Sequence, residues 1–206
     1  MPATDDRESI LSRVRGALAP LHGRAALPDY DTEIAVMRGL IAGRDLLELL
    51  GERMKRVNGL LLTDPGALVE KLRAGGWTHG YCDPALWPRL APHFGNGFQV
   101  ETEFDRTRVD DFAFGITRAS GAIAETGTII IDDATTSRRL AALTPWVHVT
   151  VLERAQIFSD LPQAVAALGR DPNVIWCTGP SKTADVEGIL IEGVHGPGQQ
   201  IALVLG

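Results

Sequence analysis

Two segments in the second half of the sequence combine glycine, hydroxyl and charged side chains of the kind that bind or transform small molecules. The first runs from residue 115 to 128 and ends in Glu125, Thr126, Gly127 and Thr128. Gly127 allows a positive φ or a close approach of the backbone to a ligand. Glu125 lies between apolar neighbours, where a carboxylate could act as a base, a nucleophile or a ligand anchor. The other interpretation of Glu125 is a solvated charge at a strand edge.

The second segment, residues 178 to 185, follows a predicted strand and places an ammonium group among hydroxyls. Its candidate ligand-binding residues are Gly179, Ser181, Lys182, Thr183 and Asp185. Loops at the carboxyl ends of strands in open α/β sheets expose backbone N–H groups, and a following helix points its positive end at the ligand. We therefore expect a phosphate or carboxylate here. A tight turn followed by a capped short helix would explain the same residues without a ligand.

A third candidate is His195, which lies among glycine and proline just before the last predicted strand. A histidine in such a loop is accessible to a ligand and can exchange protons near neutral pH. Glu125 and His195 are therefore the predicted catalytic residues. Ser181, Asp185 and His195 follow the order of some hydrolase triads, but the nucleophile elbow Gly-x-Ser-x-Gly is missing, which argues against a triad.

Other familiar sites are not predicted. Lys182 follows a serine, so the segment does not match the P-loop pattern, and no Gly-x-Gly-x-x-Gly suggests a nicotinamide or flavin site. The remaining histidines lack metal-binding spacing. We expect neither a metal nor a cofactor in this chain.

The composition limits the partners and the compartment. At 206 residues the chain fits one domain, and its net charge of −6 disfavours nucleic acid and anionic membrane surfaces as partners. Its two cysteines, Cys82 and Cys177, lie in apolar stretches and are predicted to be buried thiols. The sequence starts without a signal-like apolar segment and contains no membrane-spanning run, so we expect a cytoplasmic protein.

The elements that must position these residues alternate between strands and helices. Strands are predicted at residues 59–62, 77–82, 112–116, 129–131, 174–177 and 200–205. Asp64, Asp83 and Asp160 each precede a proline-containing helix start, because an aspartate caps the first turn and proline needs no N–H there. This rhythm predicts an α/β fold with a mostly parallel sheet covered by helices on both faces.

The chain is divided into an N-terminal helical arm, residues 1–44, and a single α/β domain, residues 45–206. Apolar residues between Ile10 and Leu18 repeat at helical spacing, and a second short helix is expected around residues 32–40. The arm could pack on the body or on another copy of the chain, which would make a homo-oligomer.

Three ordered motifs resemble the lactate utilization protein C family, whose members carry the LUD domain. They are Gly115-Ile-Thr with Ala124-Glu-Thr-Gly-Thr128, then Thr178-Gly-Pro-Ser-Lys-Thr-Ala-Asp-Val-Glu187, then Gly193-Val-His-Gly-Pro197. The resemblance implies a three-layer fold like that of CoA transferases, sugar-phosphate isomerases and glucosamine-phosphate deaminases. It also implies a role in oxidising L-lactate to pyruvate beside iron–sulfur partner proteins. Two cysteines cannot supply the four thiolates of a typical cluster, so electron transfer would belong to those partners.

Three functions remain open from the sequence. The leading one is a lactate-utilization subunit that binds a small anionic ligand between the loops at Glu125–Thr128 and Ser181–Asp185, near His195. The second is a stand-alone transferase or ligase-like enzyme that acts on a CoA ester, a folate or a sugar phosphate. The third is an adaptor without catalytic activity that docks the iron–sulfur partner.

Overall fold

The structure is a computed structural model that describes residues 6–21, 23, 35, 38–136, 138–168, 173–184 and 189–206. Its contacts divide the chain into two units, Met1–Leu40 and Ile41–Gly206, which are described separately. In the first unit, α1 (Asp6–Leu18) forms where the sequence predicts a helix, and it has no buried residue. Most of the short helix expected around residues 32–40 lies outside the described residues. Among the described helices, none is long and apolar enough to cross a membrane.

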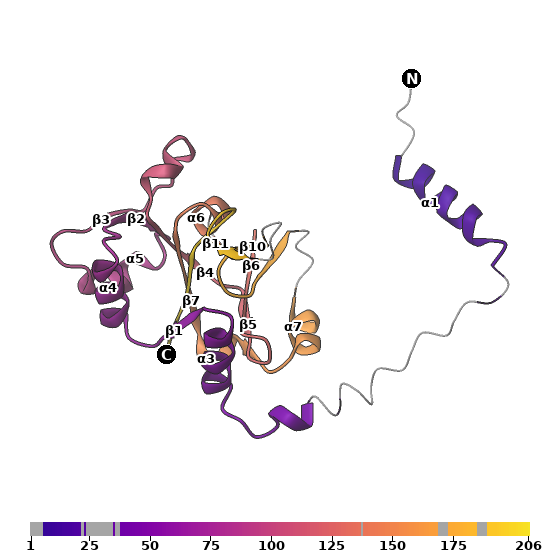
Figure 1. The fold of residues 1–206 in the computed structure, drawn as a ribbon, viewed down its shortest axis with the longest axis horizontal. Coiled ribbons are helices and arrows are strands. Elements are labelled where there is room, and N and C mark those ends of the chain that lie inside the picture. Colours follow the sequence, from indigo (N-terminus) through magenta and orange to yellow (C-terminus); the bar gives the residue numbers. More distant parts are fainter. Residues whose placement is uncertain are drawn as a thin grey trace. The chain divides into compact units, whose positions relative to one another are not determined.

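The second unit is organised around a six-stranded sheet in the order β1-β12-β7-β4-β2-β3, in which all neighbouring strands are parallel (Figure 1). The strands are β1 (Leu60–Leu62), β2 (His79–Cys82), β3 (Gln99–Glu101), β4 (Phe114–Arg118), β7 (Val147–Glu153) and β12 (Gln199–Leu205). The predictions of β1, β2, β4 and β12 are confirmed with small shifts of their ends. The long central strand β7 was not among the predicted elements.

Aspartate side chains cap the first turn of two of the predicted helices. The Asp64 side chain accepts from Gly66 N and Ala67 N, and Asp160 accepts from Gln163 N, as an N-cap does. The helices are α3 (Leu46–Arg56), α4 (Pro65–Ala74), α5 (Trp87–Leu90), α6 (Arg139–Leu143) and α7 (Leu161–Ala167), with 3₁₀ turns at Ala91–His93, Arg106–Asp111 and Arg154–Gln156. The cap predicted at Asp83 is wrong in detail, because Asp83 accepts from Ala85 N in a turn and α5 begins only at Trp87.

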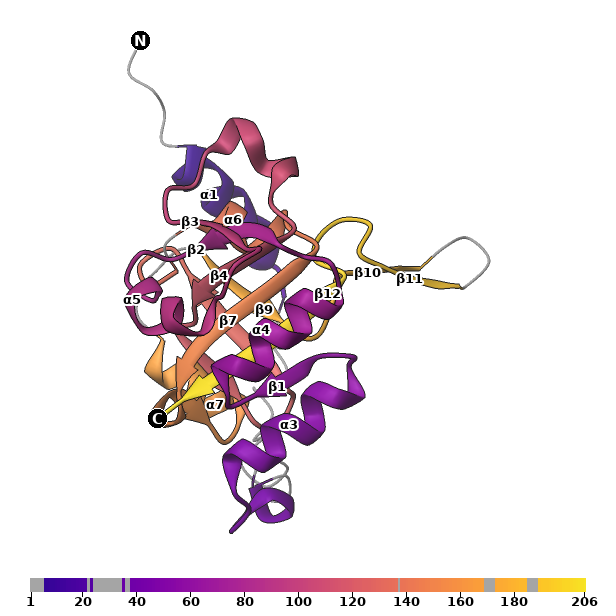
Figure 2. The same ribbon diagram turned by 90° about the vertical axis from the view of Figure 1, so that its left-hand side faces the viewer.

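A second sheet has the order β8-β5-β6-β9 and mixes parallel and antiparallel pairs. Its strands are β8 (Ile157–Phe158), β5 (Gly121–Ile123), β6 (Thr128–Asp132) and β9 (Val174–Cys177). After β9 the chain forms an antiparallel hairpin of β10 (Lys182–Ala184) and β11 (Leu190–Glu192), seen extending from the body in Figure 2. Lys182, Thr183 and Ala184 therefore form a strand of a hairpin, so no short helix begins at these three residues. The possible cap at Asp185 lies outside the described residues.

The core lies on both faces of the central sheet because side chains alternate along each strand. On one face, Val149 and Leu203 pack with Leu68 and Leu72 of α4. On the other face, Ala202 and Val204 of β12 join α3, α6 and the second sheet in a separate cluster. The chain is thus an α/β protein whose mostly parallel central sheet is covered on both sides, which confirms the predicted fold class.

Candidate functional site

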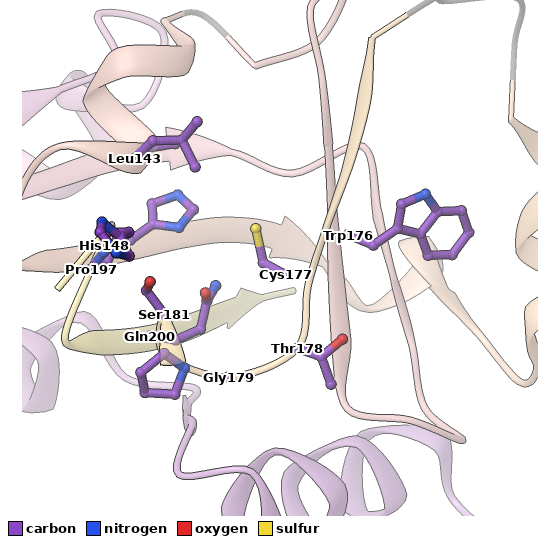
Figure 3. A pocket seen from close by; sticks show the side chains of 13 residues that line it. Leu143, His148, Trp176, Cys177, Thr178, Gly179, Ser181, Pro197 and Gln200 are labelled. Atoms are coloured by element: carbon purple, nitrogen blue, oxygen red, sulfur yellow. The ribbon is translucent and has the colours of Figure 1, made fainter. Parts of the chain in front are cut away.

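A cavity of about 350 Å³ opens on the face of the central sheet that also carries the second sheet (Figure 3). Its lining comes from the end of α6, from β7, β9 and β12, and from the loops that follow β9 and precede β12. The residues are Ala142, Leu143, His148, Trp176, Cys177, Thr178, Gly179, Pro180, Ser181, His195, Gly196, Pro197 and Gln200. The cavity lies at the carboxyl end of β9, where a site was expected in the loop after Cys177, and at the amino ends of β7 and β12, where no site was expected.

His148 and Gln200 are the buried polar side chains of this lining and form what we call the cavity floor. They are direct neighbours in the pairing of β7 with β12, and both are almost completely buried. Thr117 Oγ1 of β4 is hydrogen-bonded to His148 Nε2 at 3.0 Å, and Gln200 Nε2 donates to Thr150 Oγ1 at 3.4 Å. These polar side chains occupy the face opposite the valines of β7, so the three adjacent strands bring them together. Buried polar groups are stable only when paired in this way.

Burial decides the charge of His148. Removal from water lowers the pKa of its imidazole to about 4, and a hydrogen bond with the Gln200 side chain opposes this effect only in part. At neutral pH the ring is uncharged. His148 therefore gives the cavity floor a neutral hydrogen-bonding group.

Ser181 and His195 come from two loops that the backbone holds together. Ser181 N donates to Pro197 O at 2.9 Å, and Gly193 N donates to Ser181 O at 2.9 Å. The hydroxyl of Ser181 lines the cavity, and the exposed His195 lines it near solvent. The segment at 178–185 and the loop around His195, predicted separately, thus meet at one cavity, and Gly179 lines it too.

Gly127 and Gly179 lie against α3 and the residue that follows it. Gly179 has φ 77°, and a Cβ on it would lie 2.1 Å from Val57 O. Gly127 has φ 72°, and a Cβ there would meet the Arg53 carbonyl carbon at 2.6 Å. Both therefore require glycine for conformation and space. A row of hydroxyls connects their loops, because Thr128 Oγ1 lies 2.7 Å from Thr126 Oγ1 and 2.8 Å from Thr178 Oγ1.

The remaining predicted residues lie away from the cavity lining. Lys182 Nζ donates to Val57 O at 3.2 Å and lies 3.5 Å from Glu192 Oε1, which also accepts from Asn58 Nδ2. Glu125 Oε2 accepts from Leu161 N of α7 at 3.4 Å. The lining also lacks Thr126, Gly127, Thr128 and Thr183. Asp185 lies outside the described residues.

Sequence reasoning missed His148, Gln200 and the cavity position of Cys177. His148 and Gln200 are far apart in the chain, and only the strand pairing shows that they are neighbours. Both cysteines are free thiols, and burial raises the pKa of Cys177 to about 11, so its thiol stays protonated at neutral pH. Within the described part of the chain, no three His, Cys, Asp or Glu side chains cluster as metal ligands.

The cavity is lined mainly by neutral side chains that can bind a ligand through hydrogen bonds and apolar contacts. Its described lining contains hydroxyl, amide, imidazole and thiol groups beside apolar carbons, and none of these residues is Asp, Glu, Lys or Arg. His195 is the exposed lining residue that can carry a positive charge. The fold and this site together define an α/β protein with a parallel central sheet and a largely uncharged cavity.

Several known proteins are similar to the chain over most of its length. The family model of the LUD domain matches residues 84–205. A lactate utilization protein C from Deinococcus radiodurans is 35% identical over 100% of this chain and 99% of its own. One from Bacillus pumilus is 27% identical over 97% of this chain and 96% of its own. The crystal structure of a DUF162 family protein from Deinococcus radiodurans superposes with a TM-score of 0.57 at 26% identity, covering 78% of this chain and 96% of the other. The chain belongs to the LUD domain family.

Proposed function

We propose that this protein is a cytoplasmic subunit of a lactate-utilization system that supports the oxidation of L-lactate to pyruvate. The observation that carries the proposal is the end-to-end similarity to a protein named lactate utilization protein C, at 35% identity. An alignment that covers 100% of this chain and 99% of the relative favours a shared role over the sharing of one domain by proteins of different function.

The proposal includes iron–sulfur proteins as partners. Oxidation of a hydroxyl to a ketone releases two electrons, which need an acceptor. A typical iron–sulfur cluster uses four thiolates, and this sequence has two cysteines, whose thiol pKa values burial raises to about 12 and about 11. The electrons would therefore pass to clusters in partner subunits.

The ligand in this proposal is a small anion that binds in the cavity. Ser181 would donate its hydroxyl hydrogen, and His195 would supply a positive charge or a proton at the open end. The neutral floor of His148 and Gln200 would hold an uncharged oxygen of the same molecule. Glu125, Thr126, Gly127, Thr128, Lys182, Thr183 and Asp185 stay predicted site residues, and their variants belong in the same test.

Growth on L-lactate as the sole carbon source tests the proposal. A strain without the gene should grow poorly on lactate and normally on glucose, and the wild-type gene should restore growth. Ser181→Ala and His195→Gln should restore it only in part. His93→Gln is the matched control, because His93 is exposed in a 3₁₀ turn outside the cavity. Normal growth of the deletion strain on lactate would count against the assignment.

A further inference from the structure

The volume of the cavity exceeds what a three-carbon acid needs. Pockets of roughly 300–1,000 Å³ bury most of a drug-sized ligand, and this one measures about 350 Å³. Lactate or pyruvate alone would leave a large part of that volume to water. The size therefore favours a ligand with a longer carbon chain.

Polar and apolar groups occupy different parts of the wall. Figure 3 shows the His148 ring, the Ser181 hydroxyl and the Gln200 amide close to one another, with the Cys177 thiol directed toward them from β9. Leu143 lies above this group in the same view, while Trp176 points away on the other side of β9. Leu143, Cys177 and the buried Ala142 thus offer an apolar surface beside a cluster of neutral hydrogen-bonding groups.

The uncharged lining of the cavity floor limits how an acid can be oriented in it. A carboxylate at the floor would meet only neutral partners, and burying an uncompensated anion is unfavourable. An oxygen that is uncharged, such as a hydroxyl or ketone, fits the amide of Gln200 and the hydroxyl of Ser181. The carboxylate then belongs at the open end, where His195 is exposed.

We propose that the cavity binds 2-hydroxy or 2-oxo monocarboxylic acids whose side chain is larger than the methyl group of lactate. Ser181 and Gln200 hold the C2 oxygen, His195 faces the carboxylate, and the side chain packs on Leu143 and Cys177. This inference rests on the proposed function, because it names the class of acid that the same site accepts.

Isothermal titration calorimetry on the wild-type chain tests the inference with three probes: L-lactate, L-2-hydroxy-4-methylpentanoate and 4-methylpentanoate. The branched hydroxy acid should bind at least ~10-fold more tightly than lactate, because each buried CH₂ contributes about 0.8 kcal/mol. It should bind ~3- to 10-fold more tightly than its counterpart without the hydroxyl, because that is the range of one net hydrogen bond. Equal or tighter binding of lactate, or no saturable binding of the hydroxy acid, would overturn the proposal.

Two serine variants then locate the hydroxyl contact. Ser181→Ala should remove most of the preference for the hydroxyl while the Ser181 backbone bonds stay in place. Ser159→Ala is the control, because the Ser159 hydroxyl bonds to Gln163 outside the cavity. A preference that survives in Ser181→Ala would refute the assigned contact. If the protein binds the branched hydroxy acid but the deletion strain grows normally on lactate, the proposed function is refuted and this inference is not. If the deletion strain fails to grow on lactate but the protein does not bind the branched hydroxy acid, this inference is refuted and the proposed function is not.

Discussion

The buried imidazole of His148 makes the stability of the protein depend on pH. Its pKa is lowered from 6.5 to about 4 in the folded chain, chiefly by burial. Its neighbours on the same sheet face, Thr117, Thr150 and Gln200, do not titrate, and the Cys177 thiol in the same cavity stays protonated. His195 lines the same cavity at an exposed position, so the comparison with a His148 variant is needed to isolate His148. In the unfolded chain the His148 ring regains an ordinary pKa. Acid therefore favours the unfolded state through this one residue.

The sign and size follow from proton linkage. Between about pH 6.5 and pH 4 the unfolded state binds a proton at His148 that the folded state does not bind, so the free energy of unfolding falls as the pH falls. This contribution to stability is fully present above the unfolded pKa of 6.5, and its loss reaches about 3 kcal/mol once the pH is also below the folded pKa of about 4. At about pH 5 the expected loss is about 2 kcal/mol.

Urea unfolding of wild type and His148→Gln across this range isolates the effect. Glutamine keeps hydrogen-bonding capacity toward Thr117 and Gln200 but cannot take up a proton, so the variant should lose about 2 kcal/mol less than wild type between about pH 7.5 and pH 5. His93→Gln, at an exposed position, should follow wild type. Parallel pH curves for wild type and His148→Gln would refute the reasoning, as would an imidazole that NMR shows to be protonated in the folded protein at about pH 6.

Three further predictions concern packing, reactivity and charge. Gly179→Ala should lower the free energy of unfolding by about 2–4 kcal/mol in urea titrations, because φ 77° and the nearby Val57 carbonyl both oppose a Cβ. Gly43 has a similar φ but open space around it, so the control Gly43→Ala should lower the free energy of unfolding by only about 1–2 kcal/mol. The pKa of the Cys177 thiol is raised to about 11, so little of it is thiolate at about pH 8. Mass spectrometry should therefore show that Cys177 reacts with iodoacetamide roughly 100-fold more slowly than an exposed cysteine. Asp83→Asn should lower the free energy of unfolding by about 1–3 kcal/mol, because the buried Asp83 carboxylate accepts from Arg118 Nε at 2.7 Å. A double-mutant cycle with Arg118→Met should show that the effects of the two substitutions on this free energy are not additive.

Local signals were sufficient for much of the fold. Asp64 and Asp160 were predicted as helix caps because a cap depends on the few residues that follow it, and both accept the expected backbone hydrogen bonds. Strand β12 was predicted from its apolar run alone. Strand β7 was missed, since His148 and Thr150 interrupt its apolar pattern with side chains that are usually exposed. Their burial depends on partners from β4 and β12, which no local window contains.

The glycines show why the site was harder to predict than the fold. Gly127 was predicted to allow a positive φ or a close approach of the backbone to a ligand, and Gly179 was predicted to bind the ligand. Each carries a positive φ and makes a close backbone contact. The close contact is with Arg53 or Val57, so the glycine pattern indicated the need for space without identifying the neighbour. Lys182 is similar, because its ammonium group bonds to the Val57 carbonyl. These contacts fix the loop at Gly179 against the end of α3, and that placement allows Ser181 to meet His148 and Gln200 in one cavity. Residues predicted to bind the ligand thus hold in place the loop that lines the cavity.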